Sequence, residues 1–297
     1  MTLETLNKRI KTTTDLRDIV GTMKMLSSVS IGPYEKALVS LNEYGKTIWS
    51  AFIGLMKDDR FTDTMRPIHT THPKTIAVLI GTDNGLVGRF NRDVVQFARQ
   101  DLTQRGILSE THFICVGRRV GMLAETGHLK PDITYPILNS LKDVASVAGM
   151  VLVKINTLLA QNRSEQVLIY ATHKKSGTPQ QVRCLQLMPL PKSELKRLKH
   201  EKWEGRSLPL ITANRDELFA ALINEYLTVV LGGALTASLA AEHYTRMVNM
   251  QQAEKNIDDS LADMNLTYQQ LRQTGITDEL IDIVSGAESL KKKKGEN

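Results

Sequence analysis

The sequence predicts an α/β protein in which N-terminal and C-terminal helices form a long antiparallel coiled coil and an α/β domain is inserted between them. Three observations lead to this prediction. Apolar and small residues recur every three or four positions near both ends of the chain, and the middle alternates short apolar runs with helical periodicity. Since a complete domain separates the two terminal helices, they can pair only antiparallel.

The first terminal helix is predicted over residues 1–57. Its seam positions follow a heptad-like spacing and are Leu6, Ile10, Thr13, Leu16, Val20, Met23, Ser27, Ser30, Tyr34, Ala37, Leu41, Tyr44, Ile48 and Leu55. Gly32 and Pro33 fall inside this stretch. Because proline removes a hydrogen-bond donor and clashes with the preceding turn, we expect the helix to be interrupted there but not ended.

The inserted domain is predicted over residues 73–191. Strands are indicated by "TIAVLI", "THFICVG", "EQVLIYATHK" and "QQVRCLQLMPL". Helices are indicated from about Arg89 to Gln104, at "RRVGMLAE" and at "LKDVASVAGMVLVKINTLLAQ". Continuous apolar strands that feed helices are typical of a buried parallel sheet, so the domain is predicted to be Rossmann-like.

A polar segment, Lys192–Ser207, is predicted to be a loop or linker before the second terminal helix at 209–290 and a basic tail at 291–297. The seam of the second helix is Met247, Met250, Ala253, Ile257, Leu261, Met264, Tyr268 and Leu271.

The helix ends set an expected register. If the two helices enter the domain near Lys57 and Thr212 and rise equally, facing residue numbers sum to about 270, which sets Val20 opposite Met250. The first helix then runs out near Leu271, and Arg272–Leu290 overhang alone with an apolar stripe that requires a partner from another chain.

Composition limits the function. The charge of +6 and pI of about 9.2 suggest an acidic partner, although a solvated tail at Lys291–Lys294 is the plainer explanation. Nucleic acid is not expected, since no basic stretch carries interleaved aromatic residues. Cys115 and Cys184 lie in apolar runs, which favours buried residues in a reducing compartment. The longest uncharged run, Tyr226–Ala241, is shorter than the roughly 20 residues of a spanning helix.

The most enzyme-like motif is "GTDNGLVGRFN", Gly81–Asn91, because a glycine-rich turn between a strand and a helix can bind phosphate. It lacks the spacing of known phosphate loops, so a tight structural turn is the favoured interpretation. His69 and His72 have no co-ligand at metal spacing. No catalytic residue, metal or cofactor is predicted, and the acidic residues near Glu279 are interpreted as solvated charges.

Two terminal stretches carry a resemblance. "IKTTTDLRDIVGTMKMLSSV" and "AAEHYTRMVNMQQAEKNIDDSLADMNLTYQQLRQTGITDELIDIVSGA" resemble the gamma subunit of F-type ATP synthases, the rotating central stalk. The resemblance covers nearly the whole chain. It differs from the family at "SSVSIGP", where a basic cluster is usual, and at "GTDNGLVGRFN", where a cysteine-containing turn is usual, which points to a divergent or alternate branch.

The resemblance implies a non-catalytic rotor that couples ion flow through a membrane ring to ATP synthesis or hydrolysis on partner subunits. The implied partners are the alpha and beta subunits of the catalytic ring, the epsilon subunit and the membrane c-ring, with the chain as a peripheral protein on the cytoplasmic face of the cell membrane. The positions implied to contact the ring or brace the shaft are Met23, Arg246, Arg272, Gln273, Thr277 and Glu279.

Two alternatives remain open at this point. The first is a nucleotide-binding α/β enzyme that uses the Gly81–Asn91 turn, and the second is a static coiled-coil tether. Nucleotide binding by the isolated chain would favour the enzyme, and failure to co-purify with ATPase subunits would favour the tether.

Overall fold

The computed structural model describes residues 2–56, 74–136, 140–161, 165–174, 180–190, 210–212 and 214–294, together with Glu194, Glu201 and Trp203. The chain divides into two compact units. The central unit is Ser28–Arg246, and the terminal unit consists of Met1–Ser27 and Met247–Asn297. Two long helices, α1 (Leu3–Met56) and α6 (Arg215–Lys294), each contribute to both units.

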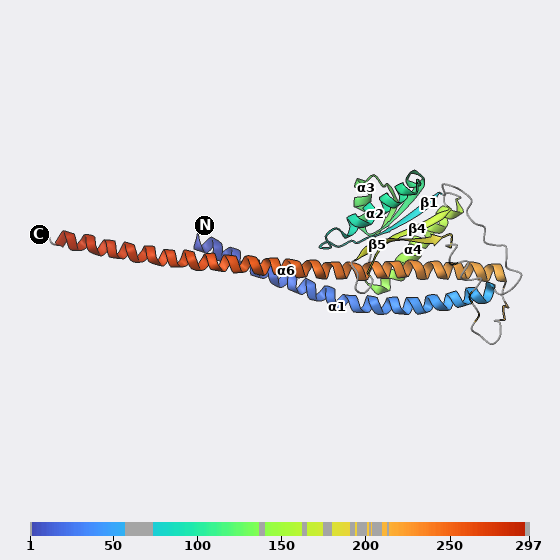
Figure 1. The fold of residues 1–297 in the computed structure, drawn as a ribbon, viewed down its shortest axis with the longest axis horizontal. Coiled ribbons are helices and arrows are strands. Elements are labelled where there is room, and N and C mark those ends of the chain that lie inside the picture. The colour runs from blue at the N-terminus through green and yellow to red at the C-terminus, as the bar shows by residue number, and fades with distance from the viewer. Residues whose placement is uncertain are drawn as a thin grey trace. The chain divides into compact units, whose positions relative to one another are not determined.

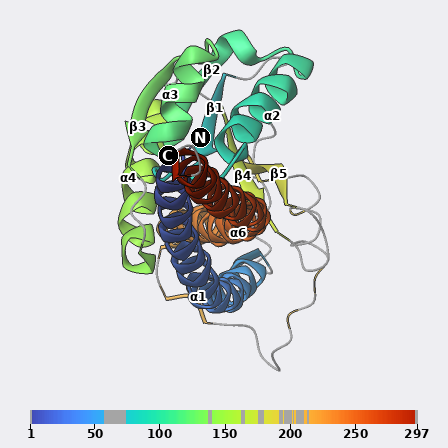
Figure 2. The same cartoon turned by 90° about the vertical axis from the view of Figure 1, so that its left-hand side faces the viewer.

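The central unit contains a five-stranded sheet (Figure 1), whose strand order is β3-β2-β1-β4-β5 (Figure 2). The first four strands in the chain are β1 (Thr75–Ile80), β2 (Thr111–Val116), β3 (Pro131–Tyr135) and β4 (Gln166–His173), and they pair in parallel. The last strand, β5 (Gln181–Met188), pairs antiparallel with β4. All six residues of β1 are buried, as expected of a central strand covered on both faces.

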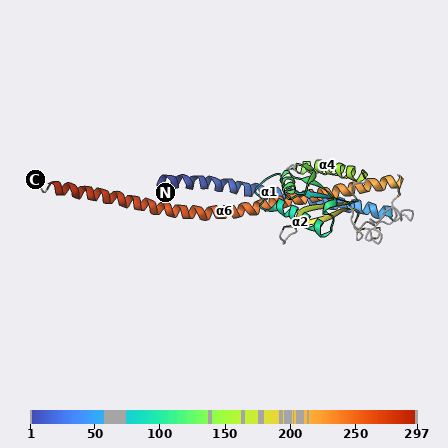
Figure 3. The same cartoon turned by 90° about the horizontal axis from the view of Figure 1, so that it is seen from above.

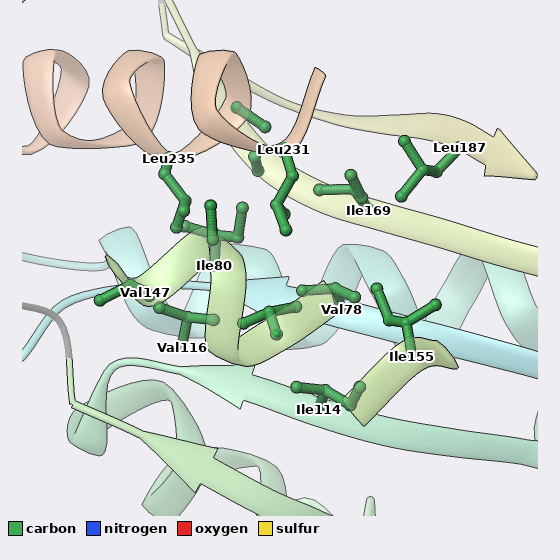
Figure 4. Close-up of a cluster of buried hydrophobic side chains, with 14 of the residues drawn as sticks. Val78, Ile80, Ile114, Val116, Val147, Ile155, Ile169, Leu187, Leu231 and Leu235 are labelled. Carbon is green, nitrogen blue, oxygen red and sulfur yellow. The ribbon is translucent and has the colours of Figure 1, made fainter. Parts of the chain in front are cut away.

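Helices cover both faces of this sheet (Figure 2). On one face α2 (Phe90–Gln104) and α3 (Arg118–Thr126) pack over a core that includes Leu79 and Tyr170. On the other face α4 (Leu141–Ala160) and α6 insert Val147, Ile155, Leu231 and Leu235 among the strand side chains (Figure 4). Helix α6 is thus part of the core of the central unit.

Within the central unit, α1 also packs against α6. Ile48, Phe52 and Ile53 form a small cluster with α6 side chains, and the Phe52 ring lies edge-on to Phe219 at 5.9 Å between centroids. Helix α1 continues through Pro33 without ending, as predicted, but the expected interruption at Gly32 and Pro33 is not observed.

In the terminal unit, α1 and α6 lie side by side and antiparallel (Figure 3). Leu6, Ser27 and Met250 are buried in the seam between them. Arg17 Nε lies 2.5 Å from Asp258 Oδ1, and Lys24 pairs with Glu254. Because these ion pairs are partly exposed, each is worth at most about 1 kcal/mol, so the apolar seam supplies most of the stability and the ion pairs favour one register.

The expected register is wrong by several residues. The numbers of the paired residues sum to 275 for Arg17 and Asp258 and to 278 for Lys24 and Glu254, not to about 270. A Cβ atom at Gly275 would lie 4.0 Å from Leu3 Cδ1, so the overhang of α6 begins near Ile276. The expected register was calculated from the ends of the helices next to the inserted domain and assumed equal rise along both. A small difference in the lengths of the two helical paths adds up over many turns.

One predicted seam position of α1 is wrong, because Leu16 is 50% exposed. Tyr44 is 47% exposed, but its hydroxyl donates to Glu225 Oε2 of α6 at 3.1 Å, so this position does contact α6. The apolar stripe of a straight helix drifts from a strict seven-residue repeat, and Arg17 takes up the contact next to Leu16 through its ion pair. All eight predicted seam positions of α6 are buried or half-buried.

The predicted helices and strands of the inserted domain are confirmed, but two features were missed. Strand β3 was not predicted because it is short and starts with a proline, a residue that weakens the strand signal and is tolerated here at the first position of an edge strand. Strand β5 runs against the parallel set. The predicted linker Lys192–Ser207 lies mostly outside the described residues, as do His69, His72 and the last three residues of the tail.

Two helices, α4 and α6, contain windows that are long and apolar enough to cross a membrane by composition alone. Their apolar residues include the side chains that pack on the sheet, among them Val151 of α4 and Leu239 of α6. Packing against the sheet gives these apolar stretches a role within the fold.

Candidate functional site

The Gly81–Asn91 turn is held by its own side chains. The Asn91 side chain accepts a hydrogen bond from Thr82 N at 2.8 Å and donates one to Thr82 Oγ1 at 2.9 Å. A Cβ atom at position 81 would lie 2.4 Å from Asn91 Oδ1 and 2.4 Å from Val120 Cβ, so only glycine fits there. The first backbone N–H group that a phosphate would need is therefore already bonded.

The space beyond this turn is occupied by α6. In an open α/β sheet, ligands bind outside the carboxyl ends of the strands where the order reverses, which in this sheet is at β1 and β4. Here Ala241 of α6 packs against Val87 and Phe90 of the segment after β1. The chain's own helix thus lies where a nucleotide would bind, and the structural interpretation of the turn is favoured over the enzymatic one.

Arg246 is buried in the central unit, at 8% exposed. Its Nη2 donates to Glu242 Oε1 at 2.5 Å, and its Nε donates to Gly85 O at 3.4 Å. Glu242 is only 1% exposed. Burial raises the pKa of the Glu242 carboxyl, and the adjacent guanidinium opposes that rise. The pair is a structural brace and not a surface contact.

His243, the residue after Glu242, has a perturbed pKa. Burial, with a smaller effect of nearby Arg246, lowers the pKa of His243 to about 4. Its ring stacks on Tyr34 of α1 at 5.4 Å between centroids, and burial together with Glu242 raises the Tyr34 pKa. His243 is therefore neutral near pH 7 and acts through packing.

The other predicted contact positions lie in the terminal unit. Met23 is half-buried on α1, and its carbonyl oxygen accepts a hydrogen bond from Ser27 Oγ at 2.8 Å. Arg272, Gln273, Thr277 and Glu279 are exposed on neighbouring turns of α6. The structure thus gathers four of the six predicted positions on one exposed stretch of helix.

An exposed apolar face runs along the same stretch of α6. Ile276, Leu280, Ile283 and Val284 follow a spacing of four, three and one, and each is at least 50% exposed. These side chains and the four polar positions beside them form the exposed C-terminal surface of the terminal unit.

The described residues contain no cluster of side chains suited to metal binding. Among them, no group of three His, Cys, Asp or Glu side chains could hold a metal ion. An open hollow of about 590 Å³ lies near the amino ends of the strands, lined by residues that include Thr111, His128 and Lys130. No carboxylate is among the described residues that line this hollow, and it lies at the opposite end of the strands from the turn after β1.

A three-layer α/β domain combined with two long terminal helices that pair antiparallel is the architecture of a stalk-like subunit. The chain belongs to the ATP synthase family, whose sequence profile matches residues 2–290.

Its curated relatives are gamma chains. The ATP synthase gamma chain of Geobacter metallireducens is 26% identical over 97% of this chain and 99% of its own length. The gamma chain of Clostridium perfringens is 27% identical over 96% of this chain and 97% of its own length.

Solved structures share the fold. A rotor chain of the Euglena gracilis mitochondrial ATP synthase covers 93% of this chain, and 99% of that chain is covered, with a TM-score of 0.63 and 15% identity. A chain from the central stalk and c-ring of the Tetrahymena thermophila enzyme gives a TM-score of 0.56 at 20% identity, covering 79% of this chain and 99% of that chain.

These comparisons confirm the predicted gamma-subunit resemblance and the predicted fold class. The gamma subunit is a structural rotor subunit of the membrane-associated ATP synthase and is not itself catalytic, so the rotor prediction is confirmed and the nucleotide-binding enzyme is not favoured.

Sequence reasoning found Arg246 but missed the residues that hold it. The spacing of Glu242 and Arg246, one helical turn apart, was visible in the sequence as an ion-pair signal. The positions of Gln180, Lys174 and Tyr34 near this turn carried no such signal, because they come from distant parts of the chain.

Proposed function

We propose that this chain couples rotation to chemistry through two distinct regions. The exposed C-terminal surface of α6 faces the alpha and beta subunits, and the α/β domain faces the epsilon subunit and the membrane c-ring. The chain acts as a peripheral subunit on the cytoplasmic face of the cell membrane. Residues 1–57 and 209–290 serve as the shaft, 73–191 as the foot and 291–297 as a basic tail.

One observation above all supports this proposal. Helix α6 continues past the start of α1 and carries Ile276, Leu280 and Ile283 on one face, each at least 50% exposed. An isolated apolar helical face is costly in water and favours a partner surface. An apolar sleeve in a surrounding ring of subunits fits it and allows rotation, because apolar contacts are not directional.

The predicted contact residues are assigned accordingly. Arg272, Gln273, Thr277 and Glu279 are polar groups beside the apolar face, where they are available for partner contacts. Met23 is half-buried on α1 and is assigned to the seam of the terminal unit, and Arg246 braces the central unit through Glu242. A shaft whose surface differs around its circumference favours a different conformation at each surrounding site in turn.

The test is purification of a tagged copy from its own cell, with its partners identified. We expect ATPase alpha and beta subunits, epsilon and the c-ring to co-purify, and we expect no Mg-ATP turnover by the isolated chain. Two results would contradict the proposal. One is a chain that purifies without these subunits, and the other is ATP hydrolysis by the isolated chain that is lost when Asp83 of the Gly81–Asn91 turn is replaced.

A matched pair of variants tests the apolar face itself. Ile276, Leu280 and Ile283 are changed to Ser in one variant, and Asp278 and Asp282 are changed to Asn in the control. Since all five side chains are exposed, neither variant should alter the thermal stability of the isolated chain. Only the first should reduce assembly or ATP-driven ion pumping; equal effects of the two would refute the assigned role of the face.

A further inference from the structure

The six consecutive residues Ala241–Arg246 of α6 are surrounded by several different parts of the central unit. None of the six is exposed. Ala241 packs on Val87 and Phe90 after β1, while Arg246 donates to Gly85 O in the same turn. The absence of any exposed position among these six is unexpected for a helix on a sheet, which normally buries one stripe.

Gln180, just before β5, brackets one turn of α6. Its Nε2 donates to Ala241 O at 2.5 Å, and its Oε1 accepts from the Thr245 hydroxyl. Thr245 Oγ1 also lies 2.8 Å from Ala241 O. One side-chain amide therefore joins a carbonyl oxygen and a hydroxyl that are four residues apart.

The two aromatic residues of the segment are held from other directions. The His243 ring stacks on Tyr34 of α1 with an interplanar angle of 22°. Lys174, which follows β4, places its Nζ 3.3 Å from the centre of the Tyr244 ring, a cation–π contact. The contacts thus come from α1, from the end of β4, from the start of β5 and from the turn after β1.

Burial around its whole circumference restricts the rotation of α6 within the domain. Successive residues of an α-helix are rotated by about 100°, so six consecutive residues cover the whole circumference. From Val229 to Arg246 no residue of α6 is exposed, whereas every turn of α1 from Ser28 to Ala51 has exposed residues. The domain encloses α6 but touches α1 along a stripe.

We propose that Ala241–Arg246 form a rotational lock, called here the α6 lock, through which torque passes between the α/β domain and the shaft. A helix held along one stripe can roll, but a helix held around its circumference cannot turn unless the domain turns with it. Of the two shaft helices, α6 is therefore the one that carries torque, and α1 supports it. This inference rests on the proposed rotor function.

The α6 lock occupies the usual ligand site of this kind of sheet. It lies at the carboxyl ends of β1 and β4, where a doubly wound sheet normally binds its ligand. In this protein a helix of the same chain, α6, is bound at that position.

The lock is tested first on the full chain by hydrogen exchange. The variant Q180M/T245V removes the bracket with little change in size. The control, Q161M/T228V, changes an exposed glutamine and an exposed threonine whose hydroxyl donates to Asn224 O of its own helix.

We expect the amides of Ala241–Arg246 to exchange at least about ten-fold faster in Q180M/T245V, since the two hydrogen bonds of Gln180 are lost, each contributes about 1 kcal/mol, and 1.4 kcal/mol corresponds to ten-fold. The control should exchange like the parent. Unchanged exchange in the bracket variant, or an equal increase in the control, would overturn the lock. If the double variant fails to fold, T245V alone is compared with T228V by the same criteria.

The mechanical role is tested in the assembled enzyme by the ratio of ions pumped to ATP hydrolysed. The bracket variant should hydrolyse ATP but pump fewer ions per ATP, and the control should match the parent. Full coupling in a variant whose lock is loosened would refute torque transfer there. Failure of the parent chain to assemble with ATPase subunits would instead refute the rotor function, while the exchange result would still decide whether the lock exists.

Discussion

Replacing Arg246 by Met should destabilise the protein in a pH-dependent way. The change leaves Glu242, which is 1% exposed, without its 2.5 Å partner. A buried carboxylate with no partner takes up a proton, and protonating a carboxyl of ordinary pKa 4.5 at pH 7 costs about 3 kcal/mol. At pH 5 the same protonation costs about 1 kcal/mol or less.

The direction of the pH effect follows from linkage. In R246M the folded-state pKa of Glu242 is raised above its unfolded value, so the stability of the variant is retained below the unfolded pKa and falls as pH rises through the folded pKa. R246M should therefore lose about 3 kcal/mol relative to the parent at pH 7 and clearly less at pH 5.

Urea unfolding followed by circular dichroism at both pH values measures this difference. The double variant E242M/R246M is the control, because replacing both members of a buried ion pair by apolar side chains is often neutral or stabilising. Equal losses in R246M at pH 5 and pH 7, or a double variant as unstable as R246M, would refute this account of the pair.

Two further predictions use matched positions. Leu261→Asp in the seam should cost about 2–3 kcal/mol and lower the helix content of the terminal unit on heating, whereas Leu266→Asp at a 59% exposed position should change little; similar melting curves would show that Leu261 does not lie in the seam. Gly81→Ala should cost at least about 2 kcal/mol because its Cβ would lie 2.4 Å from two atoms, whereas Gly149→Ala, with no atom within 4 Å, should stabilise α4 by about 0.5–1 kcal/mol in urea unfolding; a tolerated alanine at 81 would contradict the tight turn.

The predictable part of the fold is the part with local periodicity. The α6 seam from Met247 to Leu271 repeats every three or four residues, and the buried strand Thr75–Ile80 is continuously apolar, so both were recognised from sequence. The polar contact positions of the C-terminal stretch were predicted only through the resemblance, because their spacing alone indicates no more than a solvated helix face. They are Arg272, Gln273, Thr277 and Glu279.

The unpredictable part depends on long-range geometry. The register of the terminal unit follows from ion pairs such as Lys24 with Glu254, which many alternative registers could also provide. The bracket by Gln180 joins residues about sixty positions apart, and a lone glutamine has no sequence pattern. Strand β3 pairs at an edge, where sequence signals are weak.

The rigid-rotor account also makes a definite prediction about cross-links. In the observed register Val20 lies near Ile257, both half-buried, and not opposite Met250 as first expected. Cysteines at Val20 and Ile257 should therefore oxidise more readily than cysteines at Val20 and Met250.

The most direct test of the rotor is ATP turnover by the assembled enzyme after two kinds of cross-link, in a background with Cys115 and Cys184 changed to Ala. An internal disulfide between cysteines at Val20 and Ile257 joins two helices of one rigid body, so turnover should persist. A cysteine at the exposed Glu279, labelled with a benzophenone maleimide and irradiated, should become bonded to the surrounding subunits, and turnover should stop. Turnover that survives the second cross-link, or that is abolished reversibly by the first, would contradict a rigid shaft turning inside a ring.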